Sequence, residues 1–193
     1  MSPANFVVFP QTPYAIEAMR RNTLCDTQAA TIKAMMRFRP AGVYLEIGSL
    51  LGTGSTRVVL ENFPQATVVC LDLFREQLWL QSFINNVWKY RDRVRAIAGD
   101  SSQTLPVVVA AGITPDVIWI DGDHSVSGVY SDVAYCLRHF PLAIIGGDDW
   151  STAKYGACVQ KAIGQIVADG LIQKNCVKNN GRCWYFTNNS EKA

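Results

Sequence analysis

The sequence predicts an α/β fold: a doubly wound, seven-stranded sheet that is mostly parallel, ends in an antiparallel C-terminal hairpin and carries helices on both faces. Two observations predict it. Five apolar runs of strand length alternate with helix-like stretches, which implies right-handed crossovers between parallel strands. Each run has an acidic residue at or near its end: VYLEIG at 43–48, VVCLD at 68–72, VRAIAGD at 94–100, DVIWIDGDH at 116–124 and LAIIGGDDW at 142–150.

The elements follow in order along the chain. After an extended start with three prolines, residues 14–22 and 26–38 carry helix-like periodicity. Strands are expected over about 43–47, 67–71, 94–98, 116–120 and 142–146, and helices over about 54–63, 76–89, 101–111, 126–138 and 153–168. The runs GLIQKNCV and RCWYFTN flank Asn179-Asn180-Gly181, and two strand-like runs joined by such a turn predict the hairpin.

Length and composition favour a single domain of ordinary globular character. We expect one domain over 1–193, with an N-terminal helical cap over 1–40, the sheet core over 41–187 and a tail over 188–193. A formal net charge of +2 without a dense Lys/Arg run gives no reason to expect nucleic acid, and no apolar stretch reaches the roughly 20 residues of a membrane span. Six cysteines without CxxC spacing, and no signal-peptide pattern, favour the cytoplasm. A homodimer is compatible with the sequence, which does not decide the oligomeric state.

The acidic residues at the strand ends predict a binding edge. In a parallel sheet the carboxyl ends of the strands open onto one crevice, where ligands bind. Glu46, Asp72, Asp100, Asp121 and the Asp148/Asp149 pair are all expected there. Burying so many like charges is costly unless a cationic or hydroxyl-rich partner meets them.

A glycine-containing loop, EIGSLLGTGST over residues 46–56, links the first predicted strand to its helix. Its glycines allow the backbone to approach a ligand closely, and Ser55 or Thr56 can cap the helix. The loop matches neither GxGxxG nor a phosphate-binding loop, and Glu46 is unfavourable for a pyrophosphate but suits a cationic ligand. A tight strand–helix turn without a ligand is the alternative.

Asp72 and Asp100 each have two interpretations. Asp72 ends the second strand, where a carboxylate can accept from both ribose hydroxyls of a nucleoside, or it caps a helix. Asp100 can accept from an adenine amino group, or it is the N-cap of the helix expected over 101–111.

A second acidic group combines Asp121-Gly-Asp123-His124 with Asp148-Asp149 on the neighbouring strand. Three carboxylates at Asp121, Asp148 and Asp149 predict a hard oxygen site for magnesium or manganese, with a solvated acidic turn as the alternative. His124 follows this loop directly and is a candidate general base. Asp121 or Asp123 can serve instead, or His124 only hydrogen-bonds the loop.

These motifs, in this order, resemble the class I S-adenosylmethionine-dependent methyltransferases with their Rossmann-like fold. EIGSLLGTGST, the acidic strand end at Asp72, GDS at 99–101 and IDGDHS at 120–125 carry the resemblance, which spans 43–150. The terminal hairpin agrees with the reversed last strands of that class. Within it, the chain is most similar to the small metal-dependent O-methyltransferases, both the catechol type and the type that methylates sugars of macrolide and aminocoumarin antibiotics.

The resemblance implies roles for particular residues. Glu46 would lie near the methionine amino group, Asp72 would hold the ribose, and Asp100-Ser101 would border the adenine. The full set implied for S-adenosylmethionine is Glu46, Gly48, Ser49, Gly52, Thr53, Ser55, Asp72, Leu73, Asp100, Ser101 and Asp121. The sugar enzymes bind magnesium at the positions of Asp121, Asp148 and Asp149. Catechol-type enzymes have Asp-Asn in place of Asp148-Asp149, so the sugar type is favoured.

The expected function is therefore methyl transfer from S-adenosylmethionine to a hydroxyl of a sugar or glycan, assisted by Mg or Mn, with His124 or Asp121 as the catalytic residue. A catechol- or phenol-type methyltransferase acting on a small molecule is the main alternative. A nicotinamide-dependent oxidoreductase is disfavoured by the glycine spacing. A non-catalytic module that only binds the nucleoside is disfavoured by the intact acidic group at 121, 148 and 149.

Overall fold

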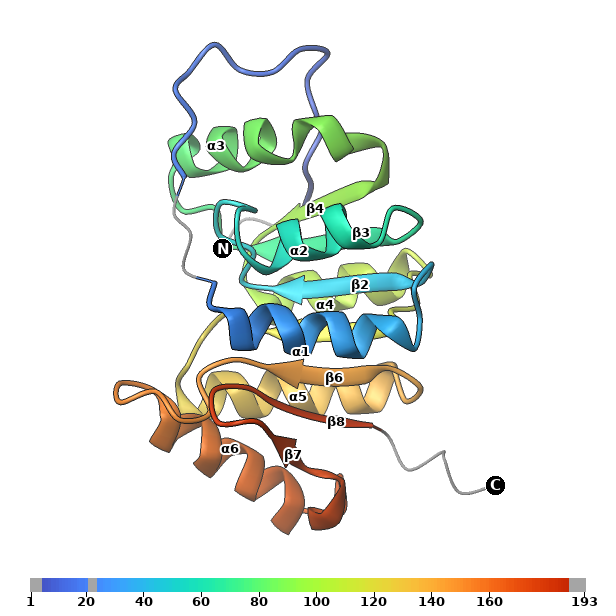
Figure 1. Ribbon diagram of the computed structural model, residues 1–193, viewed down its shortest axis with the longest axis vertical. Coiled ribbons are helices and arrows are strands. Elements are labelled where there is room, and N and C mark those ends of the chain that lie inside the picture. Colours follow the sequence, from blue (N-terminus) through green and yellow to red (C-terminus); the bar gives the residue numbers. More distant parts are fainter. Residues whose placement is uncertain (1–4, 21–23, 188–193) are drawn as a thin grey trace.

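The computed structural model describes residues 5–20 and 24–187 and shows one mixed sheet in the order β1-β4-β3-β2-β5-β6-β8-β7. The central strands run parallel, whereas β8 is antiparallel to β6 and β7. In Figure 1 the arrowheads of β2 and β6 point to the same side of the molecule. The strands are β1 (Asn5–Phe6), β2 (Val43–Ile47), β3 (Thr67–Asp72), β4 (Val94–Ala98), β5 (Val117–Ile120), β6 (Ile144–Gly147), β7 (Lys178–Asn179) and β8 (Trp184–Thr187).

Helices cover both faces of this sheet, as the sequence predicts. Figure 1 shows α1 and α2 in front of the sheet and the fainter α4 and α5 behind it. The helices are α1 (Asp26–Arg37), α2 (Ser55–Asn62), α3 (Gln77–Val87), α4 (Ser101–Ala110), α5 (Val126–His139) and α6 (Gly156–Ala168). The predicted seven-stranded fold is confirmed, and β1 is an additional two-residue strand paired antiparallel with β4.

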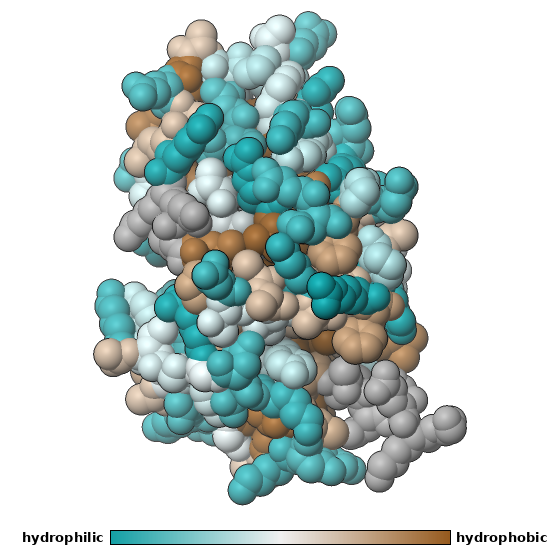
Figure 2. Space-filling model, viewed as in Figure 1, coloured by the Kyte–Doolittle hydropathy of each residue, from teal (hydrophilic) through white to brown (hydrophobic). Residues whose placement is uncertain are grey.

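The core lies on both sides of the sheet because the central strands are apolar on both faces. On β2, Tyr44 packs with α1 to α3, whereas Leu45 packs with α4 to α6. Gly146 and Gly147 in β6 allow β8 to approach, because a Cβ on Gly147 would collide with the ring of Trp184. Figure 2 shows hydrophilic residues over most of the same face, with apolar residues exposed mainly in its middle part. No helix in the described ranges has the length and apolarity that crossing a membrane requires.

The helix predicted over 14–22 is wrong for residues 14–20, which form no regular element; positions 21 and 22 lie outside the described residues. Side chains of α3 satisfy the backbone of this segment instead. Asn85 accepts from the Tyr14 N–H at 2.8 Å and donates to the Tyr14 carbonyl at 2.9 Å. Ser82 accepts from the N–H of Met19, and Asn86 donates to its carbonyl. These bonds replace the intrahelical pairs that the periodicity predicted.

The hairpin is confirmed, but its first strand lies outside the predicted run GLIQKNCV at 170–177, because β7 spans only Lys178–Asn179. Residues 171–177 form no strand, and Lys174–Cys176 within them form a 3-10 turn. The N–H groups of Cys176 and Val177 donate to the carbonyls of Gln173 and Lys174, so these groups are satisfied locally. The tail predicted over 188–193 lies outside the described residues.

Candidate active site

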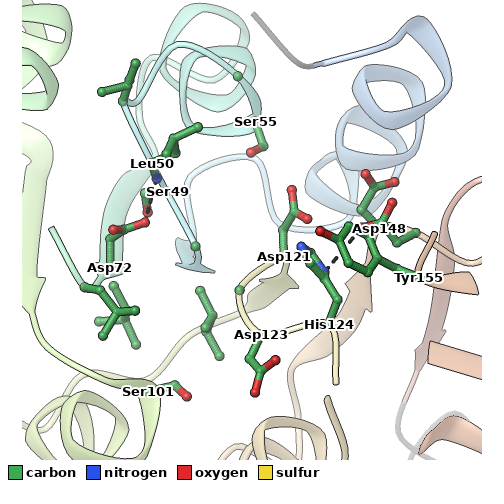
Figure 3. Close-up of a pocket in the computed structure, with 18 of the residues that line it drawn as sticks. Ser49, Leu50, Ser55, Asp72, Ser101, Asp121, Asp123, His124, Asp148 and Tyr155 are labelled. Atoms are coloured by element: carbon green, nitrogen blue, oxygen red, sulfur yellow. Dashed lines mark hydrogen bonds and ion pairs between the residues drawn. The ribbon is translucent and has the colours of Figure 1, made fainter. Parts of the chain in front are cut away.

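A cavity of about 910 Å³ opens at the carboxyl ends of the parallel strands. Loops after β2, β3, β4, β5 and β6 line it, together with α1, the start of α6 and the turn before β8. Figure 3 shows Asp72 on one side and Asp121, His124 and Tyr155 on the other. The predicted site residues that line it are Gly48, Ser49, Thr53, Ser55, Asp72, Leu73, Asp100, Ser101, Asp121, His124, Asp148 and Asp149.

The glycine loop is folded by unusual backbone angles and by contacts with β5. Gly48 has φ +92°, and a Cβ there would collide with the carbonyl of Asp121. Leu50 also has a positive φ, 49°, and its N–H donates to Asp72 Oδ2 at 2.7 Å. Gly52 does not line the cavity but packs against Val87, where a Cβ would lie 2.8 Å from Val87 Cγ1. Gly52 therefore allows the loop to pack closely against α3.

Glu46 is fully buried beneath the loop and is not among the described residues that line the cavity. The hydroxyls of Ser55 and Thr56 donate to its two carboxylate oxygens. Burial raises the pKa of Glu46 to about 7, against the lowering effect of these hydroxyls. Ser55 does line the cavity, so Glu46 acts on this end of it through Ser55.

Asp72 has the position that the sequence predicts, at the end of β3 and facing the cavity. Its carboxylate accepts from the N–H of Leu50 and, at 2.9 Å, from that of Phe74. Burial raises the pKa of Asp72, while these backbone donors lower it. The Asp72 side chain thus joins the loop after β2 to the loop after β3.

Asp100 is the N-cap of α4, so the capping interpretation is confirmed. Its Oδ1 accepts from the backbone N–H of Ser102 at 3.0 Å and from the Ser102 hydroxyl at 2.6 Å. Because Asp100 also lines the cavity, the adenine contact remains a prediction. Ser101 beside it hydrogen-bonds to Asp132, a buried carboxyl whose pKa is raised to about 6 mainly by burial.

Three side chains meet at the other end of the cavity. Asp121, His124 and Asp149 offer ligand atoms that all lie within 4.8 Å of one another. His124 Nδ1 is 3.2 Å from Asp149 Oδ2, and the imidazole lies 4.3 Å from the ring of Tyr155, centroid to centroid. Asp149 has φ +65°, a left-handed conformation that Asp tolerates better than most residues. Lys154 Nζ lies over the ring of Tyr155, 4.7 Å from its centroid.

Asp148, the third predicted metal ligand, has different partners. Arg182 donates to it with Nη2 at 2.6 Å and with Nε at 2.9 Å, and Gln28 donates with Nε2 at 2.5 Å. No local motif marks Gln28 or Arg182 in the sequence, so neither is among the predicted site residues. They line the cavity because α1 and the turn before β8 reach it from distant parts of the chain.

This end of the cavity carries more negative than positive charge. The pKa of Asp121 is raised well above its usual range, first by burial and then by Asp148 and Asp149. Arg182 is the cation that faces this group from the turn before β8, and it already pairs with Asp148. A bound cation would favour ionised Asp121 and stabilise the cluster.

A family model described as a methyltransferase domain matches residues 45–150, more than half of the chain. The chain belongs to this methyltransferase family. The matched region begins on β2 and ends at Trp150. It therefore contains the glycine loop and all of the acidic strand ends described above. The predicted resemblance to the class I S-adenosylmethionine-dependent methyltransferases is confirmed.

Solved structures share the methyltransferase fold. An O-methyltransferase from Bacillus cereus in complex with SAH has a TM-score of 0.65 at 18% identity, covering 85% of this chain and 82% of that one. The O-methyltransferase TomG from Streptomyces achromogenes, involved in tomaymycin synthesis and in complex with SAM, has 0.65 at 15%, covering 86% and 82%. The SAH-bound methyltransferase PaMTH1 of Podospora anserina has 0.60 at 19%, covering 83% and 77%. No curated protein matches the chain in sequence.

Proposed function

We propose that this methyltransferase transfers the methyl group of S-adenosylmethionine to a hydroxyl of a sugar or glycan, with help from a divalent cation. The observation that carries the proposal is the position of the His124–Asp149 pair beside Asp121, in the same cavity as the glycine loop and Asp72. Structures of the same fold are O-methyltransferases with SAM or SAH bound, which supports the cofactor and the reaction type.

The residues at the loop end fit S-adenosylmethionine, which supplies an activated methyl group on a sulfonium. Asp72 offers carboxylate oxygens for the ribose hydroxyls, as acidic residues at this place in such sheets do. Ser55 presents its oxygen to the cavity while its proton is given to Glu46, so it can accept from an ammonium group. Asp121 offers a further carboxylate from the other end of the cavity. The cationic cofactor therefore meets complementary charge.

His124 is proposed as the general base. If its Nδ1–H donates to Asp149, Nε2 keeps a lone pair that can take the proton of an acceptor hydroxyl. Asp149 then stabilises the imidazolium that forms, the role that a carboxylate has in catalytic triads. The imidazole is held by Tyr155 on one face, and its side chain keeps 24% of its surface exposed, so an acceptor can reach it.

The donor set also fits a divalent cation. Asp121 and Asp149 would hold it with carboxylate oxygens next to His124, and magnesium or manganese commonly bind through one or two carboxylates and keep open positions. Such a cation lowers the pKa of a hydroxyl that it contacts. The Asp148-Asp149 sequence, in place of Asp-Asn, supports a sugar acceptor over a catechol.

The direct test is methyl transfer from [methyl-¹³C]S-adenosylmethionine to a panel of sugars, glycosides and catechols, followed by mass spectrometry. We expect a product on a vicinal aliphatic hydroxyl, loss of turnover with chelator, and at least a hundredfold lower kcat for His124→Asn. His139→Asn is the matched control, since His139 stacks on Tyr135 in α5 and does not line the cavity. A product formed only on catechols would instead indicate a catechol- or phenol-type methyltransferase. Binding of NADH without binding of S-adenosylmethionine would contradict the proposal.

A further inference from the structure

Two adjacent aspartates at the end of β6 have opposite surroundings. Asp148 is 4% exposed and receives a two-point contact from the Arg182 guanidinium, a hydrogen bond from Gln28 and a weak one from the Cys183 thiol at 3.8 Å. Asp149 faces His124, and its Oδ1 is 3.8 Å from Arg182 Nη2. Asp149 has a left-handed backbone with φ +65°.

The donors around Asp148 leave little of its carboxylate for another ligand. An ionised carboxylate has about four lone-pair sites, and Arg182 and Gln28 together occupy three of them. The fork of a guanidinium matches a carboxylate geometrically and neutralises its charge. A cation at Asp121 and Asp149 would therefore gain no oxygen from Asp148 unless Arg182 moved.

We propose that Arg182 is a positioning residue that withholds Asp148 from the cation site, so that only Asp121 and Asp149 supply carboxylates there. The inference rests on the cation site of the proposed function. Its chemical consequence follows from charge: a divalent cation with two carboxylates is neutral, whereas a third carboxylate would make the group negative. A negative group would oppose formation of an alkoxide on the acceptor, so the Arg182–Asp148 pair preserves the activating power of the cation.

The arrangement also links remote parts of the chain to the site. Arg182 lies in the turn before β8, and Gln28 lies in the first turn of α1. Asn180, in the same turn, donates to Thr31 of α1 at 2.5 Å, so helix and turn are connected directly. Asp148 is thus the point where α1, β6 and the hairpin are joined by polar contacts.

The test is Mn²⁺ binding to the purified protein, followed by electron paramagnetic resonance and without any turnover. Asp148→Asn should leave the Mn²⁺ affinity within about twofold of wild type, because Asp148 is not a ligand. R182M should raise the affinity at least tenfold by releasing Asp148, and the double variant R182M/D148N should lose that gain. Arg138→Met, an exposed arginine of α5, is the control for loss of a positive charge.

Each outcome decides the inference. A tenfold weaker Mn²⁺ affinity for Asp148→Asn, or an unchanged affinity for R182M, would overturn it. If wild type binds no Mn²⁺, the inference is wrong whether or not R182M binds it, because Asp121 and Asp149 are expected to form the site without Asp148. If R182M folds poorly, Asp148→Asn alone still decides the inference, because its expected affinity does not depend on the R182M protein. Failure of the proposed function is seen separately, as absence of methyl transfer.

Discussion

At the scale of single residues, the site depends on how each acidic side chain is partnered rather than on how many there are. Glu46 is covered by two hydroxyls, Asp72 by two backbone N–H groups and Asp148 by Arg182. Asp149 faces His124. Glu46 and Asp148 therefore organise the fold, Asp72 both joins two loops and faces the cavity, and Asp149 is paired with a side chain that can act on a ligand.

Asp149→Asn tests the pairing with His124. Asn tolerates a positive φ nearly as well as Asp, so the backbone should be preserved while the negative charge is lost. We expect kcat to fall by about tenfold to a thousandfold in steady-state kinetics, because the imidazolium loses its stabilising carboxylate. Asp92→Asn, at an exposed position near β4, should leave kcat unchanged. An unaltered kcat for Asp149→Asn would remove Asp149 from the mechanism.

Glu46 predicts a pH dependence of stability. Its pKa is raised from 4.5 to about 7 by burial, so between these values the folded chain binds a proton that the unfolded chain has released. Stability should therefore fall as pH rises through this window, by about 3 kcal/mol in total for this group. Urea denaturation at pH 5 and pH 8 should show a smaller loss for Glu46→Gln than for wild type. Equal losses in both proteins would contradict the assignment.

At the scale of elements, the parallel strands and their helices could be predicted because both faces of the sheet are buried and the pattern is local. The two errors have a common cause. At 14–20 and 171–177 the backbone is satisfied by side chains of α3 or by a local turn, and neither leaves a periodic signal. Gln28 and Arg182 could not be predicted for the same reason, because their role depends on contacts with Asp148, which is 120 and 34 residues away in the sequence.

The close approach of β6 and β8 gives a stability prediction at this scale. A Cβ on Gly147 would lie 2.7 Å from Trp184 Cζ2, in a fully packed part of the core, and would also meet the Ile120 carbonyl. Gly147→Ala should lower the free energy of unfolding by about 1–3 kcal/mol. Gly164→Ala in α6, where nothing lies within 4 Å of the added methyl, should raise it by about 0.5–1 kcal/mol. Urea denaturation of both variants makes the comparison, and equal effects would refute the packing argument.

At the scale of the whole molecule, one cavity joins the two halves of the acidic edge. The loop after β2 and Asp72 form the end proposed for the nucleoside, and Asp121, His124 and Asp149 form the end proposed for the acceptor. The order of motifs along the chain was sufficient to predict this division, because strand ends of a parallel sheet share one edge. The order of motifs does not predict the identity of the acceptor, since residues from α1, α6 and the hairpin turn also line the cavity.

The central claim, that this cavity binds S-adenosylmethionine with its methyl group near His124, is tested most directly by isothermal titration calorimetry with S-adenosylhomocysteine. One site per chain is predicted, with at least tenfold weaker binding for Asp72→Ala and nearly unchanged binding for His124→Asn. Absence of binding at millimolar ligand by the folded protein, or equal binding by Asp72→Ala, would contradict it.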